Sequence, residues 1–290
     1  MTLLAPILEI NVADLTRSFG TKLAVAGISF QVYRGELFAF LGPNGAGKTT
    51  TINLLTGLLI PDSGEVSYRG ELFDPARLAV KQMIGVVPQH NNIDKELTVA
   101  ENLRVHGVLF GLRGQMLHER INFCLDFADL YAKRHTPAGK LSGGMKRKLV
   151  IARALLHQPK ILFLDEPTVG LDPHSRRCMW AFLRRINIEQ QCTVFLTTHY
   201  IEEAESLAQR VMIMDRAKII ASGTPNELKQ RVGHYVLDIY EDGNLENEFF
   251  IDRTTAMQRL EQLELSVRIR ETTLEDVFLQ LTGKRIMGDA

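Results

Sequence analysis

Residues 42–49 read GPNGAGKT, which matches the phosphate-binding pattern GxxxxGK[ST]. An apolar segment, 37–41, precedes this stretch and a helix-compatible segment, 48–55, follows it, as the pattern requires. Glycines let the backbone approach phosphates closely, the start of a helix directs unpaired N–H groups at them, and Lys48 adds a cation. The hydroxyl of Thr49 is a suitable Mg²⁺ ligand. The stretch therefore predicts a site for nucleotide phosphates.

Two adjacent acids, Asp165 and Glu166, follow the apolar run 161–164. Ligands of parallel sheets bind at the carboxyl ends of the strands, where these acids are expected. Asp165 is suited to holding Mg²⁺ and Glu166 to polarising an attacking water. Two acids can also simply end a strand, but beside a phosphate loop they predict a metal ligand and a catalytic base.

Two further polar residues follow strand-like segments. His199 comes after TVFLTT, and Gln89 comes after IGVVP. A histidine at a strand end is placed to contact a terminal phosphate, and a glutamine there can approach a metal. Most single histidines lie on the surface or in packing, so neither residue is specific by itself.

The order of the segments predicts an α/β fold. Short strands at 7–12, 23–32 and 36–41 and a hairpin-like stretch at 61–70 precede a helical pattern over 98–140. The runs 161–164 and 193–196 are apolar without alternation, and each follows a helical segment. Such strands are typical of a parallel sheet covered on both faces.

The last 62 residues differ in charge from the rest of the chain. Residues 229–290 carry 8 basic and 12 acidic side chains, which leaves a net charge of +4 for residues 1–228. We predict a main domain over 1–228 and a small C-terminal α+β domain over 229–290. The alternative is a C-terminal extension that packs on the main domain.

Within this tail, alternating segments at 235–240 and 267–270, a second short strand at 249–251 and a helix-like segment at 256–263 precede a final helix. Thr272 and Glu275 are spaced as a capping box, and Gly283 is a stop signal. The pattern places Leu274, Phe278 and Leu281 on one helix face.

Composition excludes several classes. Of 290 residues, 34 are Lys or Arg and 34 are Asp or Glu, so no basic excess indicates a nucleic-acid partner. The three cysteines lack metal-ligand spacing. No secretory signal and no run of about 18 apolar residues is present, so a membrane-spanning part would have to come from another chain.

A second anion site is predicted at 141–149, LSGGMKRKL. Its glycines expose backbone N–H groups, Ser142 offers a hydroxyl donor, and the helix start adds positive dipole. Lys146, Arg147 and Lys148 point in different helical directions, so at most one or two can face a nucleotide. We expect the remaining cations to be solvated or to face a partner.

Taken in order, GPNGAGKT, VVPQ, LSGGM, ILFLDEPTVGLD and TTH resemble the nucleotide-binding subunit of an ATP-binding cassette (ABC) transporter over about residues 8–228. The resemblance implies a P-loop NTPase with a RecA-like parallel-sheet core, an N-terminal antiparallel β subdomain and an inserted helical subdomain at about 90–155.

The resemblance also implies site residues. It gives Lys48, Gln89, Glu166 and His199 as catalytic residues, and Thr49, Gln89 and Asp165 as Mg²⁺ contacts. In RSFG, Phe19 stands where the family stacks an aromatic ring on adenine; the alternative is a core aromatic at a strand end. The ATP-binding set implied is Phe19, Gly42, Pro43, Asn44, Gly45, Ala46, Gly47, Lys48, Thr49, Thr50, Ser142, Gly143, Gly144 and, in the D-loop, Asp172.

In this family two cassettes meet head to tail, with each ATP between the phosphate loop of one and the signature of the other, which the resemblance places at residues 142–144 of this chain. One copy of each motif implies a homodimer or a paralogous ATPase partner. Met145 in place of glutamine, MKRKL, PQHN and TTLEDVF resemble the drug-resistance exporter branch that works with ABC-2 type permeases. The resemblance therefore implies a peripheral subunit at the cytoplasmic face of the inner or plasma membrane. It implies a separate permease docked near residues 90–92 and the stretch from Leu97, although simple loop and helix packing explains these residues equally well.

Three other classes fit less well. A GTPase or small-molecule kinase would use the phosphate loop, but the chain has no NKxD and such enzymes have no use for LSGG. Cassettes that act on ribosomes or DNA usually carry paired cassettes or long coiled coils. A cassette that binds ATP without hydrolysis is disfavoured by Glu166 and His199.

Overall fold

The computed structural model describes residues 6–76, 78–241, 244–263 and 266–283. Its centre is a six-stranded sheet in which five neighbouring strands are parallel and β10 pairs antiparallel to β9 at one edge. The predicted α/β fold is confirmed. In spatial order the strands are β10 (Lys218–Gly223), β9 (Arg210–Asp215), β3 (Leu37–Leu41), β8 (Thr193–Thr198), β7 (Ile161–Asp165) and β6 (Ile84–Val87).

Both faces of this sheet are buried, because alternate side chains of each strand enter different hydrophobic clusters. On β3, Leu37, Ala39 and Leu41 belong to one cluster, and Phe38 and Phe40 belong to the other. A strand that is buried on both faces has no polar face, which explains the apolar runs 37–41 of β3, 161–164 of β7 and 194–196 of β8.

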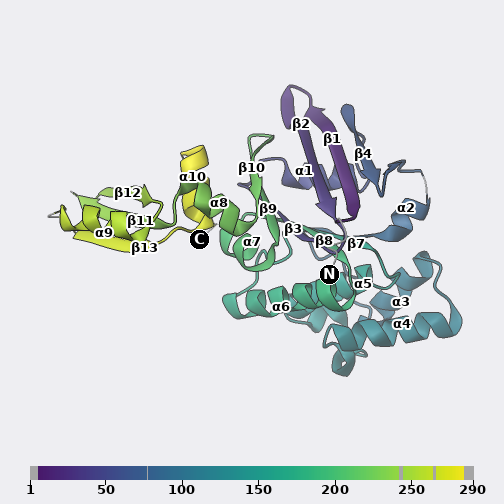
Figure 1. Ribbon diagram of the computed structural model, residues 1–290. Helices are drawn as coiled ribbons and strands as arrows, with labels where there is room; N and C mark the ends of the chain where they lie inside the picture. The colour runs from purple at the N-terminus through teal and green to yellow at the C-terminus, as the bar shows by residue number, and fades with distance from the viewer. Residues whose placement is uncertain (1–5, 77, 242–243, 264–265, 284–290) are drawn as a thin grey trace, which may run out of the picture.

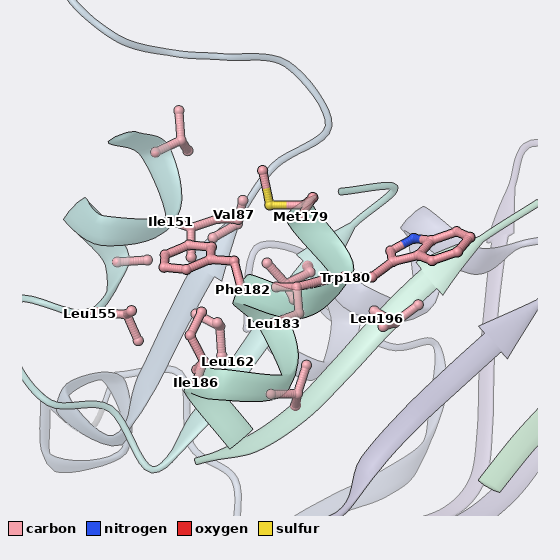
Figure 2. Close-up of a cluster of buried hydrophobic side chains, with 14 of the residues drawn as sticks. Val87, Ile151, Leu155, Leu162, Met179, Trp180, Phe182, Leu183, Ile186 and Leu196 are labelled. Carbon is pink, nitrogen blue, oxygen red and sulfur yellow. The ribbon is translucent and has the colours of Figure 1, made fainter. Parts of the chain in front are cut away.

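The first cluster lies between the sheet and two helices, α5 (Gly143–Ala154) and α6 (Pro173–Glu189). Figure 2 shows Phe182, Leu183 and Ile186 of α6 close to Ile151 of α5 and Leu162 of β7. This packing fixes the start of α5, where the LSGG residues lie, relative to the carboxyl end of β7.

The second cluster joins the central sheet to an N-terminal antiparallel sheet of order β2-β1-β4-β5. Phe38 and Phe195 of the central sheet contact Phe30 of β2, with ring centroids 6.0 and 6.1 Å from it. The predicted β subdomain is confirmed. Its strands are β1 (Leu8–Phe19), β2 (Lys22–Tyr33), β4 (Ser63–Tyr68) and β5 (Glu71–Leu72), and the nearby helices are α1 (Lys48–Leu55) and α2 (Leu78–Met83).

The predicted helical region contains α3 (Val99–Leu109) and α4 (Gly114–Phe127). Two short 3₁₀ turns follow, Tyr131–Lys133 and Ala138–Lys140. The side chains of Thr98 and Glu101 form a capping box that starts α3.

The C-terminal part contains a three-stranded antiparallel sheet of order β12-β11-β13. Figure 1 shows this sheet and α9 projecting from one side of the molecule, joined to it through α8 and α10. The elements after β8 and outside the central sheet are α7 (Ile201–Leu207), α8 (Pro225–Val232), β11 (Tyr235–Glu241), β12 (Asn244–Phe250), α9 (Arg253–Glu261), β13 (Ser266–Glu271) and α10 (Leu274–Thr282).

The last helix returns to the main body. Leu274, Val277 and Phe278 of α10 belong to the large cluster under the central sheet, whereas Leu237 and Ile239 of β11 form a small cluster with Ala256 of α9. The tail therefore combines a sheet with its own small core and a helix that packs on the main domain. The boundary after residue 228 falls inside α8, and the division into two domains stays a prediction.

The start of α10 differs from the expectation. The capping box is formed by Thr273 and Asp276, so the predicted pair of Thr272 and Glu275 is wrong by one residue. Asp276 is buried and also bonds to Arg270 of β13, which selects this register. Leu281 is 46% exposed and does not share the buried face of Leu274 and Phe278, while Gly283 ends the helix in the left-handed conformation as predicted.

Candidate nucleotide-binding site

The carboxyl ends of four parallel strands bring the predicted catalytic residues together. The loop 42–47 follows β3, Gln89 comes shortly after β6, Glu166 follows β7 and His199 follows β8. Because β8 lies between β3 and β7, the loop and the acids face each other across one strand. Such an edge of a parallel sheet is the usual place for a ligand.

The phosphate loop has no room for side chains at two of its glycines. A Cβ at Gly42 would lie 2.2 Å from the carbonyl oxygen of Met214. A Cβ at Gly47 would lie 2.3 Å from the carbonyl oxygen of Ala24, and Gly47 has a φ of 114°. The chain therefore needs glycine here for the loop to curl back to the start of α1.

Lys48, Glu166 and His199 form a buried cluster. Nζ of Lys48 lies 3.2 Å from Oε1 of Glu166 and donates a hydrogen bond of 2.8 Å to the carbonyl oxygen of Gly42. Nδ1 of His199 lies 3.2 Å from Oε2 of Glu166, and Nε2 has no hydrogen-bond partner within the described residues. A buried lysine cation and a buried histidine whose Nε2 has no partner within the described residues fit a polyanionic ligand.

Burial and charge act in opposite directions on this cluster. Burial lowers the pKa of Lys48, and the nearby charges of Glu166 and Asp165 offset only part of that effect. Burial alone would raise the pKa of Glu166, but His199 and Lys48 together outweigh it and hold this pKa below its ordinary value. Glu166 is therefore a carboxylate at neutral pH, as a proton acceptor must be.

Thr49 and Asp165 lie in direct contact. Oγ1 of Thr49 donates hydrogen bonds of 3.1 and 2.9 Å to the two carboxylate oxygens of Asp165, and Oγ1 of Thr197 donates one of 2.5 Å. In the part of the chain described, no three His, Cys, Asp or Glu side chains gather as a metal site. A hydroxyl and one carboxylate suit Mg²⁺, which takes few protein ligands and completes its shell with phosphates and water.

Glu166 is held in a strained conformation beside Gln89. Its φ of 45° is in the left-handed region, and its backbone N–H donates to both the carbonyl and the hydroxyl of Thr197 at 3.1 Å. Nε2 of Gln89 donates a 3.2 Å hydrogen bond to Oε2 of Glu166. Non-glycine residues in this region of φ are concentrated at functional sites.

A cavity of about 400 Å³ opens beside the phosphate loop. Phe19 at the end of β1 lines it and is 46% exposed, which argues against a core aromatic, and the guanidinium of Arg17 lies 5.1 Å from the ring centroid. Gly42, Pro43 and Ala46 belong to the same loop without lining the cavity. The complete lining is Phe19, Lys22, Ala24, Asn44, Gly45, Gly47, Lys48, Thr49, Thr50, Gln89 and Glu166.

The signature residues and Asp172 lie outside this cavity. Ser142 caps α5 by accepting a hydrogen bond from the N–H of Met145, and Asp172 caps α6 by accepting one from Ser175. A Cβ at Gly144 would lie 3.4 Å from Oγ of Ser175, so the two helix starts are neighbours. Both caps are exposed, and their backbone N–H groups are therefore available to a ligand from outside the chain.

Three residues near the site were missed or misjudged from the sequence. Lys22 and Ala24 of β2 line the cavity, but no motif marks them. Arg147 was expected to face a nucleotide, solvent or a partner; it is instead buried and bonded to main-chain carbonyls, because its position on α5 turns it towards β7.

The fold and the site define a phosphate-loop NTPase. The family model described as ABC transporter matches residues 25–169. The chain is 40% identical to the Nod factor export ATP-binding protein I of Burkholderia lata, over 97% of this chain and 99% of that protein. It is also 40% identical to the protein of the same name from Rhizobium sp. strain N33, over 96% and 98%. The chain belongs to the ABC transporter family, and is an ABC-type transport ATPase subunit.

Solved structures agree with this assignment. CbiO1 from Clostridium perfringens, part of an ABC transporter complex, matches with a TM-score of 0.72 and 28% identity, over 76% of this chain and 90% of that one. A dimeric post-hydrolysis structure of the ATP-binding cassette MJ0796 with ADP and Pi matches with a TM-score of 0.66 and 27% identity, over 74% and 98%. Among the helices described here, none has both the length and the apolar character needed to cross a membrane.

Proposed function

We propose that this chain hydrolyses ATP in a head-to-tail dimer, with itself or a paralogous subunit, and thereby drives export through a separate ABC-2 type permease. It would act as a peripheral subunit at the cytoplasmic face of the membrane. The names of relatives with about 40% identity, which describe export ATP-binding proteins, support this proposal. The permease would line the transport path and so would determine the exported molecule.

Each residue of the buried cluster has a role that its position supports. Lys48 would donate to phosphate oxygens in place of Glu166 and the loop carbonyls, since its Nζ already lies between them. Glu166 would accept the proton of the attacking water at its carboxylate, and Gln89 would orient that water. Nε2 of His199 would donate to a terminal phosphate oxygen.

Mg²⁺ would be held by the hydroxyl of Thr49 and the carboxylate of Asp165, and the amide oxygen of Gln89 would be a further ligand. When bound, the ion would neutralise charge on the phosphates. Thr197 would keep the Asp165 carboxylate in place through its 2.5 Å hydrogen bond.

The signature would serve the partner's site. Ser142, Gly143 and Gly144 start α5 on an exposed surface, outside the cavity that holds Lys48. A second copy can therefore present its phosphate loop to them, and the exposed Asp172 beside them would contact the same partner. The observation that carries the proposal is this separation of two phosphate-binding features on one chain.

A candidate docking surface for the permease lies near α3. Val105, Val108 and Leu109 of that helix are exposed apolar side chains. Residues 90–92, which connect β6 to this region, are exposed as well. Co-purification with its membrane partner, lost on substituting Val108 and Leu109 by serine but retained for serine at the remote exposed Ile188, would support this surface.

The dimer is tested with Glu166→Gln. This substitution keeps the shape of the side chain and removes the proton acceptor. We expect turnover to be abolished and a dimer to accumulate with Mg²⁺ and ATP, detected by size-exclusion chromatography with light scattering. EDTA should return the protein to monomers. Turnover near the wild-type rate would contradict the assigned base, and a monomer under all conditions would contradict the composite site.

A further inference from the structure

Arg147, which lies on α5 two residues after Met145, is buried. Ser142 starts α5 at the surface, yet Arg147 on the same helix is only 3% exposed. Its neighbours on the helix behave differently: Lys146 is half-buried, and Lys148 pairs with the exposed Asp129 at 2.7 Å. Of the three cations at 146–148, Arg147 is therefore the one that the fold buries.

The guanidinium of Arg147 donates four hydrogen bonds, all to main-chain carbonyl oxygens. Nη1 donates to Pro88 at 2.5 Å and to Gln89 at 3.1 Å. Nε donates to Pro167 at 2.8 Å, and Nη2 donates to Asp165 at 3.0 Å. The two segments that it joins follow different strands, β6 and β7.

These four carbonyls belong to the two backbone segments that carry Gln89 and Glu166. Asp165 and Pro167 are the residues immediately before and after Glu166, whose backbone has a φ of 45°. Gln89 is itself one of the acceptors, and its side chain donates to Glu166. Arg147 thus holds the backbone on both sides of the 3.2 Å contact between Gln89 and Glu166.

Only arginine fits this arrangement. Carbonyl dipoles from two separate segments converge on one planar group, which presents several N–H donors in fixed directions. Burial lowers the pKa of Arg147 to about 10, so it stays charged at neutral pH. A lysine would keep the charge but could not bond to both segments in the same geometry.

The same helix holds the segment that contains Gln89 at a second point. Arg153 of α5 donates to the carbonyl and the side chain of Asn92. Residues 88–92 are therefore attached to α5 at both ends, while the start of α5 carries the exposed Ser142.

We propose that Arg147 is a positioning residue that fixes Gln89 against Glu166 and ties this contact to the signature helix. The inference rests on the catalytic roles proposed for Gln89 and Glu166. Through Arg147, the position that α5 takes when a partner's nucleotide binds at Ser142 sets the geometry at this chain's own Glu166.

The test compares Arg147→Lys and Arg147→Gln with Lys148→Gln as the matched control. We expect kcat of both Arg147 variants to fall by about 10- to 100-fold, as displaced catalytic groups commonly cause. The affinity of the monomer for ATP should change by less than threefold, because the hydrogen bonds of Arg147 go to residues 88, 89, 165 and 167 and so lie outside the phosphate loop. Lys148→Gln should keep the wild-type kcat.

A double-mutant cycle separates positioning from simple loss of stability. In a Gln89→Ala background, Arg147→Lys should reduce kcat several-fold less than in the wild type, because the contact it positions is already gone. Equal fold-losses in both backgrounds would overturn the proposal. So would a parallel fall of ATP affinity, kcat and melting temperature in Arg147→Lys. If wild type and Glu166→Gln turned over ATP equally, the proposed base would fail instead, a result distinct from either of these.

Discussion

Oγ1 of Thr49 donates a 2.9 Å hydrogen bond to Oδ2 of Asp165, although β3, which precedes the phosphate loop, and β7, which ends at Asp165, are separated by β8. This bond joins the phosphate loop to the acid at the end of β7. The order of the strands thus sets the candidate Mg²⁺ site.

Lys48→Ala should weaken nucleotide binding itself. Hydrogen bonds to charged groups are worth roughly 1.5–3 kcal/mol, so the affinity for ATP should fall by about 10- to 100-fold. Titration of the purified protein with a fluorescent ATP analogue measures this. Lys160→Ala, before the opposite end of β7, is the control and should bind as the wild type does. An unchanged affinity of Lys48→Ala would contradict its role on the phosphates.

Phe19→Ala should weaken ATP binding through loss of stacking. Substitution of an aromatic side chain that stacks on a base costs about 1–3 kcal/mol, so a loss of about 5- to 100-fold is expected. Stacking tolerates any base, so the affinity for GTP should fall in proportion, and Phe19→Tyr should restore both. Phe123→Ala on α4 removes another exposed phenylalanine, remote from the cavity, as a control. Wild-type affinity in Phe19→Ala would show that the ring does not meet the base.

Asp276→Asn should destabilise the C-terminal helix, whereas Glu275→Gln should not. Asp276 is buried and bonded to Arg270 and Thr273, while Glu275 is exposed. We expect the free energy of unfolding at pH 7 to fall by about 1–3 kcal/mol for Asp276→Asn and by less than about 0.5 kcal/mol for Glu275→Gln. Equal effects of the two substitutions would contradict the capping register.

The contacts of Asp276 also make the stability of the protein depend on pH. Burial alone would raise the pKa of Asp276, but Arg270 and Thr273 outweigh it and hold this pKa below its ordinary value. The stabilisation from the charged carboxylate is therefore complete above the unfolded pKa of about 3.9 and is lost as pH falls through the lower folded value. Denaturation curves should show the wild type and Asp276→Asn converging below about pH 4. A difference that grows towards acid pH would contradict this sign.

Most of the fold could be predicted because its signals are local. The apolar strands without alternation, such as 161–164, reflect burial on both faces, and GPNGAGKT marks a strand, a turn and a helix in one stretch. The proposed catalytic residues follow for the same reason, since each lies in the segment that follows a strand of one parallel sheet: Glu166 and His199 directly, Gln89 two residues later, and Lys48 after the phosphate loop. Their juxtaposition then depends only on strand order.

The parts that could not be predicted depend on contacts between distant segments. The surroundings of Arg147 are carbonyls of residues 88–89 and 165–167, which the sequence of α5 does not reveal. The register of α10 was missed because Thr272 and Thr273 both suit a cap, and the choice is made by Arg270 of β13. Lys22 lines the cavity only because β2 packs beside the phosphate loop.

Subunit mixing tests the composite site most directly. Lys48→Ala damages only the phosphate loop of a subunit, and Ser142→Arg damages only its signature. A mixed dimer would therefore join one intact loop to one intact signature. We predict that each variant alone lacks ATP turnover and that an equimolar mixture regains it in proportion to the fraction of mixed dimers. A mixture no more active than its two components would contradict the claim that each ATP is shared between two chains.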